Sequence, residues 1–419
     1  MLEIFTKEQI AAVYQNLVRK KTADRNKKLP IGIDGVSSEV FERNFNFSLN
    51  EIYRKLLVQN GKIGYLFAPL LRIEKTKSKG GTRSLHIPRL RDQVVFRLLH
   101  NEIQKVSFAQ GIDLRVKSPY SYIQSFDRYT QNFPNSVILK TDIVQFYDTI
   151  PREFVLNLCK KLGLRQELYD FLKSWSEHFR IRHANFDLQT EFHPSLGLPQ
   201  GLSISSLLAE LYAKQIDHVF STDSGYFRYI DDIVIVCSDF ESAYQKLANL
   251  KQVVEDLGLK LSSQKTDVLR LKNGFEWLGL IHFPGCRRIH SDKLIKSMKP
   301  LRGLQKACLY KVTTNQSELR QSEAIKDFIC QVDKYICGSK KVRLKWYSLI
   351  EDEGQWRLMD KYIHGLIYSC IRKANLDYDL FQPLPSIHSK IISYRKVKGS
   401  PIMPIKGNAP SVLNTKNAD

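Results

Sequence analysis

The sequence lacks clustered cysteines, long apolar runs and enough acidic residues to balance its basic ones. Its seven cysteines are scattered and form no CxxC pair, which argues against a zinc site or a disulfide framework and predicts a reducing, cytoplasmic environment. No apolar run approaches the ~20 residues that span a bilayer. The first residues contain no basic segment followed by an apolar core, so we expect neither a membrane span nor a signal peptide.

The shortage of acidic residues leaves a large positive charge. Lys and Arg number 64 against 43 Asp and Glu, which gives a formal net charge of +21. This excess favours a polyanionic partner, with nucleic acid first and an anionic membrane surface second. A hydrophobic content of 43% over 419 residues predicts two or three domains with a sizeable core.

The pattern of apolar residues changes near residue 290. Before it, helices alternate with strands, which predicts an α+β body; after it, only helical spacing is visible. The predicted helices lie at 10–17, 50–58, 91–106 and 241–258, and residues 151–178 are expected to be mainly helical. Residues 198–220 are expected to form a loop that enters a helix, and Ser37 or Ser38 is expected to cap a further helix. The predicted strands are a ribbon at 70–88, a buried strand ending near Asp142, and segments at 259–263 and 275–283. Helical stripes follow at 325–336 and 359–370, and the basic segment after about 385 is expected to be mobile.

The segment FRYIDDIVIV (227–236) places two adjacent acids between apolar runs. One interpretation is an ordinary hairpin turn, since Asp is common in turns. The other is a metal site, because a divalent cation offsets the repulsion between neighbouring carboxylates. Asp142 ends the strand VILKTD, so two neighbouring strands would bring Asp142, Asp231 and Asp232 together.

Taken in order, the motifs between about residues 30 and 285 resemble those of reverse transcriptases, in particular bacterial group II intron, retron and related enzymes. LPQG and YIDD are the most specific of them. The resembling blocks are GIDGV (32–36), YLFAP (65–69), KGGTRSLHIPRLRDQVV (79–95), DIVQFYDTI (142–150), LGLPQGLSISSLLAELY (196–212), YIDD (229–232), LKLSSQKT (259–266) and FEWLGL (275–280).

The resemblance implies a right-hand polymerase fold, with fingers and palm followed by an all-helical thumb. It divides the chain into an N-terminal segment with fingers (1–135), a palm (136–290), a helical thumb or C-terminal domain (291–385) and a basic, flexible tail (386–419).

The resemblance also implies roles for individual residues. Asp142, Ile143, Asp231 and Asp232 would bind two Mg²⁺ ions, for which Mn²⁺ can substitute, and Lys265 would join the aspartates in catalysis as the general acid. The residues expected at the nucleotide are Lys79, Arg83, Phe146, Tyr147, Gln200 and Gly201, and those expected in the primer grip are Trp277, Leu278 and Gly279. Five of these residues also have an ordinary structural interpretation. Lys79, Arg83 and Lys265 could be solvated charges, and Tyr147 and Trp277 could be core aromatics.

Missing parts narrow the class of enzyme. The sequence has no VTG-type triplet after the primer grip, no Cys/His cluster of an HNH nuclease, no RNase H pattern and little room for a maturase extension. What remains resembles the stand-alone reverse transcriptases of antiphage defence, including the abortive-infection type. This implies a structured noncoding RNA template, deoxynucleoside triphosphates as substrates and a DNA product.

Other functions remain open from the sequence alone. The same palm could perform template-independent or protein-primed synthesis, with a residue such as Tyr394 as primer. A catalytically silent maturase or RNA-binding scaffold is a further alternative, although it has no need of the acids and Lys265. An RNA-dependent RNA polymerase is disfavoured by Tyr147 and YIDD. The priming mode and oligomeric state cannot be read from the sequence.

Overall fold

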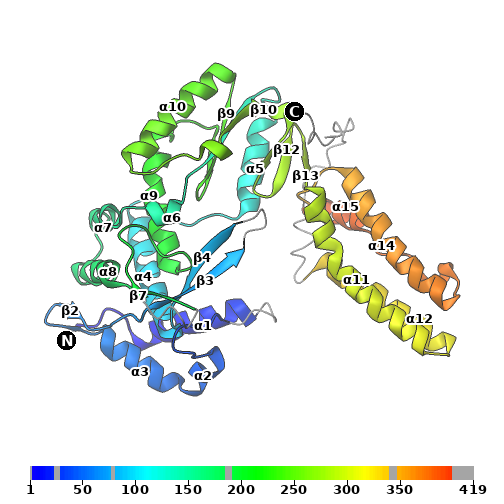
Figure 1. Ribbon diagram of the computed structural model, residues 1–419, viewed down its shortest axis with the longest axis horizontal. Coiled ribbons are helices and arrows are strands. Elements are labelled where there is room, and N and C mark those ends of the chain that lie inside the picture. The colour runs from blue at the N-terminus through cyan, green and yellow to red at the C-terminus, as the bar shows by residue number, and fades with distance from the viewer. Residues whose placement is uncertain (1, 23–28, 77–80, 185–190, 339–346, 399–419) are drawn as a thin grey trace. The chain divides into compact units, whose positions relative to one another are not determined.

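The structure is a computed structural model in which the chain forms two compact units. It describes residues 2–22, 29–76, 81–184, 191–338 and 347–398. The first unit comprises Met1–Ser118, Leu139–Ile235 and Glu241–Val268, and the second comprises Pro119–Ile138, Val236–Phe240 and Leu269–Asp419. The units are therefore interleaved along the chain. Figure 1 labels their elements.

The first unit begins with three helices, α1 (Lys7–Thr22), α2 (Ser38–Arg43) and α3 (Phe45–Leu56). The expected cap is confirmed at Ser37, whose hydroxyl accepts a hydrogen bond from the backbone N–H of Val40 at 3.3 Å. Helix α3 starts five residues before the predicted 50–58 and ends earlier. Its buried face includes Ile52 and Leu56, and the chain then turns into β1 (Val58–Gln59), which pairs with β2 (Lys62–Ile63).

The predicted ribbon forms a mixed sheet with two short strands. Strands β3 (Leu70–Thr76) and β4 (Thr82–Ile87) pair antiparallel, and β6 (Ile181–His183) pairs parallel to β3 and antiparallel to β7 (Glu191–Phe192). The register places Lys75 opposite Arg83. Gly81, after the ribbon's turn, has a φ of +78°, a conformation that glycine adopts without strain. Lys79 lies outside the described residues.

Helices cover this unit around α4 (Leu90–Ala109), which contacts both α1 and α9 (Ser203–Val219). Helix α4 also buries an acid, Asp92, which is fully satisfied: it accepts hydrogen bonds from the Tyr65 hydroxyl at 2.7 Å and from the Arg89 guanidinium at 3.1 Å. The remaining helices of this unit are α6 (Phe146–Thr149), α7 (Arg152–Lys161), α8 (Gln166–His178) and α10 (Phe240–Asp256).

A four-stranded sheet carries the acids that the sequence singled out. Its strand order is β10 (Asp267–Arg270), β5 (Val137–Asp142), β9 (Asp232–Cys237) and β8 (Tyr226–Tyr229). The central strands β5 and β9 are almost wholly buried, as the apolar runs at 137–139 and 233–237 indicate. The expected strand at 259–263 is wrong: Leu261 makes only an isolated bridge to Ile143, and Ser263–Lys265 forms a 3₁₀ turn.

In the second unit the predicted strand 275–283 is two strands, β11 (Phe275–Trp277) and β12 (Leu280–Phe283), with β13 (Cys286–Arg288) beside β12. Helix α5 (Pro119–Thr130) supplies the Phe126 ring, which lies 5.5 Å from the Phe275 and Trp277 rings between centroids. Asp127, next on α5, accepts a hydrogen bond from the Arg287 guanidinium. Residues far apart in the sequence therefore form one core.

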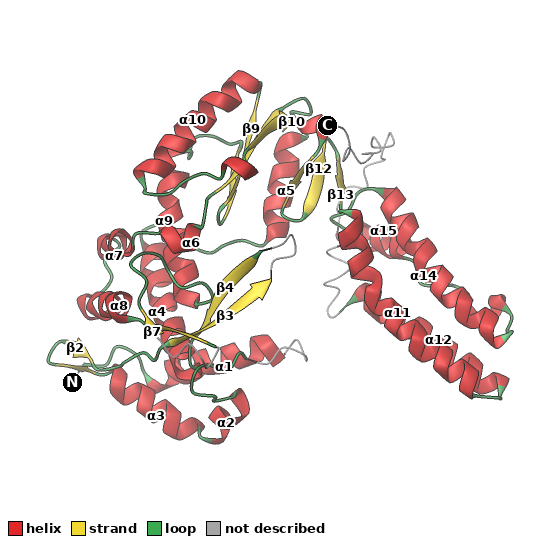
Figure 2. Ribbon diagram, in the orientation of Figure 1, coloured by secondary structure: helices red, strands yellow, loops and turns green. Residues whose placement is uncertain are grey.

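From Ser291 onward the described chain is helical apart from its connections (Figure 2). The helices are α11 (Ser291–Thr314), α12 (Glu318–Cys337), α14 (Glu353–Ala374) and α15 (Ile387–Lys398). The predicted stripe on α12 is confirmed, with Ile325, Phe328 and Val332 at most 2% exposed. The structure differs after residue 385, because Ile387 and Ile391 are buried and hold α15 in the core. Among the described helices, none combines the length and apolar character needed to cross a membrane.

The helical core gives a first prediction. Phe328→Ala should lower the free energy of unfolding by about 3–5 kcal/mol, because Phe328 is fully buried and its removal leaves a cavity. Leu319→Ala on the same helix is the control, since Leu319 is 71% exposed and should change stability by no more than about 0.5 kcal/mol. Urea unfolding followed by circular dichroism measures both; equal effects would contradict this packing.

Candidate active site

The end of β5 meets the turn of the β8–β9 hairpin. The two strands β5 and β9 are neighbours, and the backbone N–H of Ile143 donates to the carbonyl oxygen of Asp231 at 3.1 Å. Asp142, which ends β5, thus lies beside the turn that carries Asp231 and Asp232. The backbone segments that carry the three acids are therefore adjacent.

The hairpin turn is strained where it precedes the acids. Tyr229 pairs with Asp232, so Ile230 and Asp231 form the two-residue turn. Ile230 has a φ of +63°, the left-handed region that β-branched residues strongly avoid. Such a conformation costs on the order of 1–3 kcal/mol and persists only when the surrounding structure enforces it.

Asp232 lies in an environment that disfavours its charge. Burial, with the neighbouring Asp142 and Asp231 charges, raises its pKa to about 7, although Lys140 and Lys265 oppose the rise. One of its carboxylate oxygens, Oδ1, is buried without a hydrogen-bond partner among the described residues. A divalent cation would stabilise the buried charge of Asp232 and would also bond its unpartnered Oδ1 atom, because it is positively charged and binds carboxylate oxygens directly. The donor set therefore fits a hard metal ion such as Mg²⁺.

Lys265 forms an ion pair with Asp142. Its ammonium nitrogen lies 2.9 Å from Asp142 Oδ1. The lysine is held there by its backbone, since the Ser262 N–H donates to the Asp142 carbonyl at 2.8 Å and the Thr266 and Thr141 hydroxyls are 2.7 Å apart. Among the described residues, no three Asp, Glu, His or Cys side chains are gathered closely enough to hold a metal ion. Metal binding would require Lys265 to release Asp142.

Tyr147 lies next to the acids on the short helix α6. Burial raises the pKa of its hydroxyl, which also forms a hydrogen bond with Ser206 of α9 and is near the Asp231 charge. The backbone fixes the residue as well, because the Leu198 N–H donates to the Tyr147 carbonyl at 2.7 Å. Phe146 differs: its ring is 3% exposed and belongs to the core.

The loop with Gln200 and Gly201 is fitted closely against its surroundings. The His86 N–H of β4 donates to the Gln200 carbonyl at 2.7 Å. Gly201 has a φ of +108°, and a Cβ atom there would lie 2.8 Å from the His86 carbonyl oxygen. Gly197 is equally restricted, since a Cβ would lie 2.5 Å from the Asp148 carbonyl oxygen. Only glycine allows these approaches.

Arg152 of α7 clamps the start of this loop. Its guanidinium donates to the carbonyl oxygens of Pro194, Ser195 and Gly197 at 2.8–3.0 Å, and it lies over the Phe179 ring. No sequence pattern singles out Arg152, because an arginine near a helix start carries no local signal of what it will contact.

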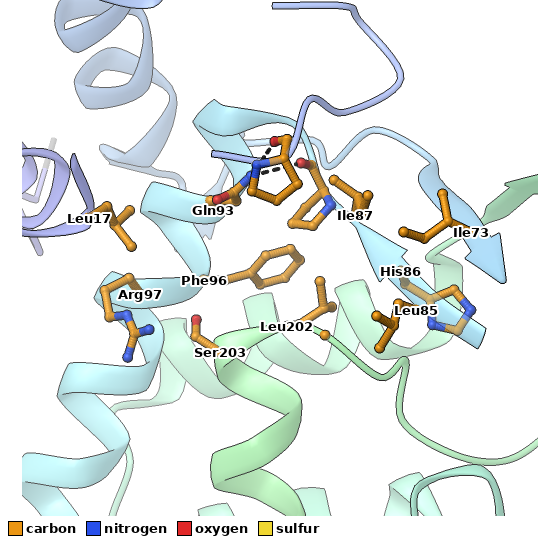
Figure 3. A pocket seen from close by; sticks show the side chains of 13 residues that line it. Leu17, Ile73, Leu85, His86, Ile87, Gln93, Phe96, Arg97, Leu202 and Ser203 are labelled. Carbon is orange, nitrogen blue, oxygen red and sulfur yellow. Dashed lines mark hydrogen bonds between the residues drawn. The ribbon is translucent and has the colours of Figure 1, made fainter. Parts of the chain in front are cut away.

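A cavity of about 300 Å³ borders the same loop (Figure 3). Gly201, Leu202 and Ser203 form one wall, and Arg97 and Phe96 of α4 form another. Gln93 closes an edge by donating to the carbonyl oxygens of Pro30 and Pro88. None of the three aspartates lines the cavity, so it is distinct from the carboxylate cluster.

The remaining residues with a predicted role are Arg83, expected at the nucleotide, and Trp277, Leu278 and Gly279, expected in the primer grip. Arg83 is exposed on β4 of the first unit. In the second unit, Leu278 and Gly279 form the turn between β11 and β12, with φ values of +47° and +85°. Trp277 is 1% exposed, so its ring is a core aromatic. Leu278 packs partly against the helical core.

Asp142, Asp231 and Asp232 lie on adjoining ends of β5 and the β8–β9 hairpin, with Lys265 and the half-buried Tyr147 beside them. This is the arrangement expected of a nucleotidyl-transfer site of the polymerase type. Residues 73–282 match the family described as reverse transcriptase (RNA-dependent DNA polymerase). That segment is half of the chain and includes all three acids. The chain belongs to the reverse transcriptase family.

Individual relatives are distant. The "Putative COX1/OXI3 intron 2 protein" of Saccharomyces cerevisiae is 24% identical over 163 residues, which cover 36% of this chain and only 18% of that protein. Telomerase of Candida albicans, solved in complex with a fragment of telomeric RNA, is 12% identical with a TM-score of 0.45 and coverage of 86% of this chain and 69% of that one. Apo telomerase of Candida tropicalis is 12% identical with a TM-score of 0.46, covering 81% and 67%.

The burial of Asp232 gives a prediction for the metal-free protein. Its pKa of about 7 in the folded state exceeds the ordinary value of 3.8, so the folded protein binds more protons between these values and loses stability as pH rises through them. Asp232→Asn should match wild type near pH 4 and be a few kcal/mol more stable at pH 8, at about 1.4 kcal/mol per pKa unit.

Urea unfolding in a chelator at pH 4, 6 and 8 measures this effect. Asp256→Asn, at an exposed position, is the control and should follow wild type at every pH. Added Mg²⁺ at pH 8 should stabilise wild type and narrow its gap to Asp232→Asn, because a ligand that binds the folded state alone adds stability. Parallel curves for wild type and Asp232→Asn would contradict the burial of this charge.

Proposed function

We propose that this chain is an RNA-directed DNA polymerase that joins deoxynucleotides by a two-Mg²⁺ mechanism. The observation that carries the proposal is the carboxylate cluster at the meeting of β5 and the β8–β9 turn, within the segment that matches the family. The unpartnered oxygen of Asp232 and its raised pKa are features of a site that is completed by a cation.

In this proposal Asp142, Asp231, Asp232 and the backbone of Ile143 hold the metal ions. Two such ions would activate the primer 3′-hydroxyl and stabilise the departing pyrophosphate. The protein's contribution is to hold mutually repelling carboxylates in a partly buried place, where their interaction with a cation is stronger than in water.

Lys265 has two roles in the proposal. Without metal it neutralises Asp142 through its 2.9 Å ion pair. Once released from Asp142, its ammonium group would be free to turn toward the triphosphate and to donate a proton to the leaving pyrophosphate. Its side chain is 62% exposed, so this movement meets little steric resistance.

Other residues would position the substrates. Arg83, with Lys79 nearby in sequence, would bind the triphosphate, and Gln200 with Gly201 would lie beside the incoming nucleotide. The Leu278–Gly279 turn would contact the primer. In the helical region, α11 exposes a series of cations suited to the phosphates of a template–primer duplex, namely Lys296, Lys299, Arg302 and Lys306.

The finer assignment is also a proposal. The +21 charge and the absence of nuclease motifs support a stand-alone enzyme of the antiphage type, acting in the cytoplasm on a structured noncoding RNA. Sequencing the RNA and DNA that co-purify from the native host tests this directly. One defined RNA with complementary DNA would support it, and a random RNA population would contradict it.

The polymerase activity itself is tested by removing the acids. Asp231→Asn with Asp232→Asn should reduce Mg²⁺-dependent extension of a DNA primer on an RNA template by at least about 1,000-fold, because metal ions supply several kcal/mol and each 1.4 kcal/mol is about tenfold. Folding should survive, since the change removes like charges. Asp256→Asn is the matched control and should extend normally.

Sugar selection is tested at Tyr147. A rigid ring beside the acids leaves no volume for a 2′-hydroxyl, and a shift of ~1 Å at the reacting phosphate costs ~100-fold in rate. Tyr147→Ala should therefore raise the ratio of kcat/KM for ribonucleotide to that for deoxynucleotide. Tyr147→Phe should keep the wild-type ratio, because it keeps the ring and loses only the Ser206 bond. An unchanged ratio in Tyr147→Ala would show that the residue is only structural.

A further inference from the structure

A buried arginine lies directly behind the active-site turn. Arg228 of β8 has a side chain only 3% exposed and donates to two acids of helix α9. Its Nε and Nη2 atoms lie 2.7 Å from the two carboxylate oxygens of Asp217. Its Nη1 and Nη2 atoms lie 3.0 and 2.7 Å from Glu210. Both acids are thus bound in a two-pronged manner, which fixes the plane of the guanidinium.

The same guanidinium reaches the strained residue of the turn. Arg228 Nη1 donates to the carbonyl oxygen of Ile230 at 3.0 Å. Ile230 is the residue with a φ of +63°, and its carbonyl belongs to the peptide bond that leads into Asp231. This hydrogen bond therefore holds the peptide group between Ile230 and Asp231, and a rotation of that peptide group would move Asp231.

Stability alone does not account for this cluster. Burial disfavours the charge of Arg228, yet the bonds to Asp217 and Glu210 outweigh that effect and raise its pKa well above the ordinary value. Buried ion clusters of this kind are often replaced by apolar side chains without loss of stability. What an apolar side chain cannot supply here is a hydrogen-bond donor to Ile230.

We propose that Arg228, oriented by Glu210 and Asp217, is a positioning residue that keeps the Tyr229–Asp232 turn in its strained form and so sets the backbone of Asp231. The proposal rests on the polymerase function proposed above. Without the bond, the Ile230 carbonyl loses its buried donor and the residue relaxes toward negative φ. The Asp231 carbonyl, which accepts from Ile143 at the end of β5, then shifts with it.

Lys214 offers a matched control within the same cluster. It lies one helical turn from Glu210 on α9 and contacts Glu210 at 3.8 Å and Asp217 at 3.1 Å. Lys214 has no bond to the turn among those that the structure describes. Replacing it removes a positive charge from the same acids while leaving the Arg228–Ile230 bond in place.

The test compares four variants by steady-state kinetics. Arg228→Lys keeps the charge, but a single ammonium cannot serve both acids and the carbonyl, so kcat should fall by about 10–100-fold with little change in the nucleotide KM. Lys214→Met should keep kcat within about twofold of wild type. Arg228→Met combined with Glu210→Gln and Asp217→Asn leaves no buried charge unpaired, so it should fold and still show the low kcat.

The fourth variant combines Arg228→Lys with Ile230→Asn, which relieves the backbone strain at residue 230. Asn tolerates the left-handed region, so Ile230→Asn should restore a large part of the kcat lost in Arg228→Lys. A merely structural role for the cluster would show no such rescue. The inference is overturned if the neutral triple variant folds with wild-type kcat, if Lys214→Met loses as much activity as Arg228→Lys, or if Ile230→Asn rescues nothing.

A readout without substrate or metal separates this inference from the proposed function. Amide hydrogen exchange at residues 230–232 should be at least about tenfold faster in Arg228→Lys than in wild type and unchanged in Lys214→Met, since exchange reports local opening. An inactive wild-type enzyme would overturn the polymerase proposal, and the exchange rates would then decide the role of Arg228. Equal exchange in all variants would overturn that role.

Discussion

Asp142, Asp231 and Asp232 lie on adjoining backbone segments, and the repulsion between their negative charges affects the side chains around them. Asp232 responds by a raised pKa, and Asp142 responds by pairing with Lys265. Their backbones are fixed in place, because Asp142 ends the buried strand β5, Asp231 lies in the two-residue turn and Asp232 begins β9. A sheet with a core on both faces thus enforces an arrangement that the charges alone would not adopt. A cation bound at the site proposed above would offset this repulsion.

Close backbone contact is the second feature of the site. The loop at Gly197–Gly201 contacts α6 on one side and β4 on the other, at distances that no Cβ atom could accept. Arg152 then fixes the loop from its exposed side. Backbone-to-backbone contact of this kind has few rotatable bonds, so the tyrosine, the loop and the acids keep a constant spacing. In the function proposed above this loop would lie beside the incoming nucleotide, where small displacements at a reacting phosphate are costly in rate.

Much of this could be predicted from the sequence. The strand ending at Asp142, the hairpin at YIDD and the stripe on α12 follow from period and turn chemistry, and all three are observed. The 259–263 segment was predicted wrongly because its alternating apolar residues read as a strand, whereas only Leu261 forms a bridge. The segment after 385 was misjudged because its basic composition hid two apolar residues, Ile387 and Ile391, at helical spacing.

Buried charge was beyond sequence reasoning. Arg228 lies within the segment FRYIDDIVIV, yet only its hydrogen bonds to Glu210 and Asp217 of α9 reveal that its side chain points inward. Its signal was a charge in alternation with Phe227 and Tyr229, which also suits a half-exposed strand. Which face of a strand is buried depends on elements far away in sequence. Long-range pairing of this type is what local patterns leave undetermined.

The interleaving of the two units has a consequence for synthesis on the ribosome. Helix α5 leaves the ribosome early, but Phe126 and Asp127 find their partners only at Phe275, Trp277 and Arg287. About 150 residues must be made in between, and at 5–20 residues per second this takes roughly 10–30 seconds. During that time an aromatic ring and a carboxylate that end up in a core are exposed to water. The second unit therefore cannot form until most of the protein has been translated.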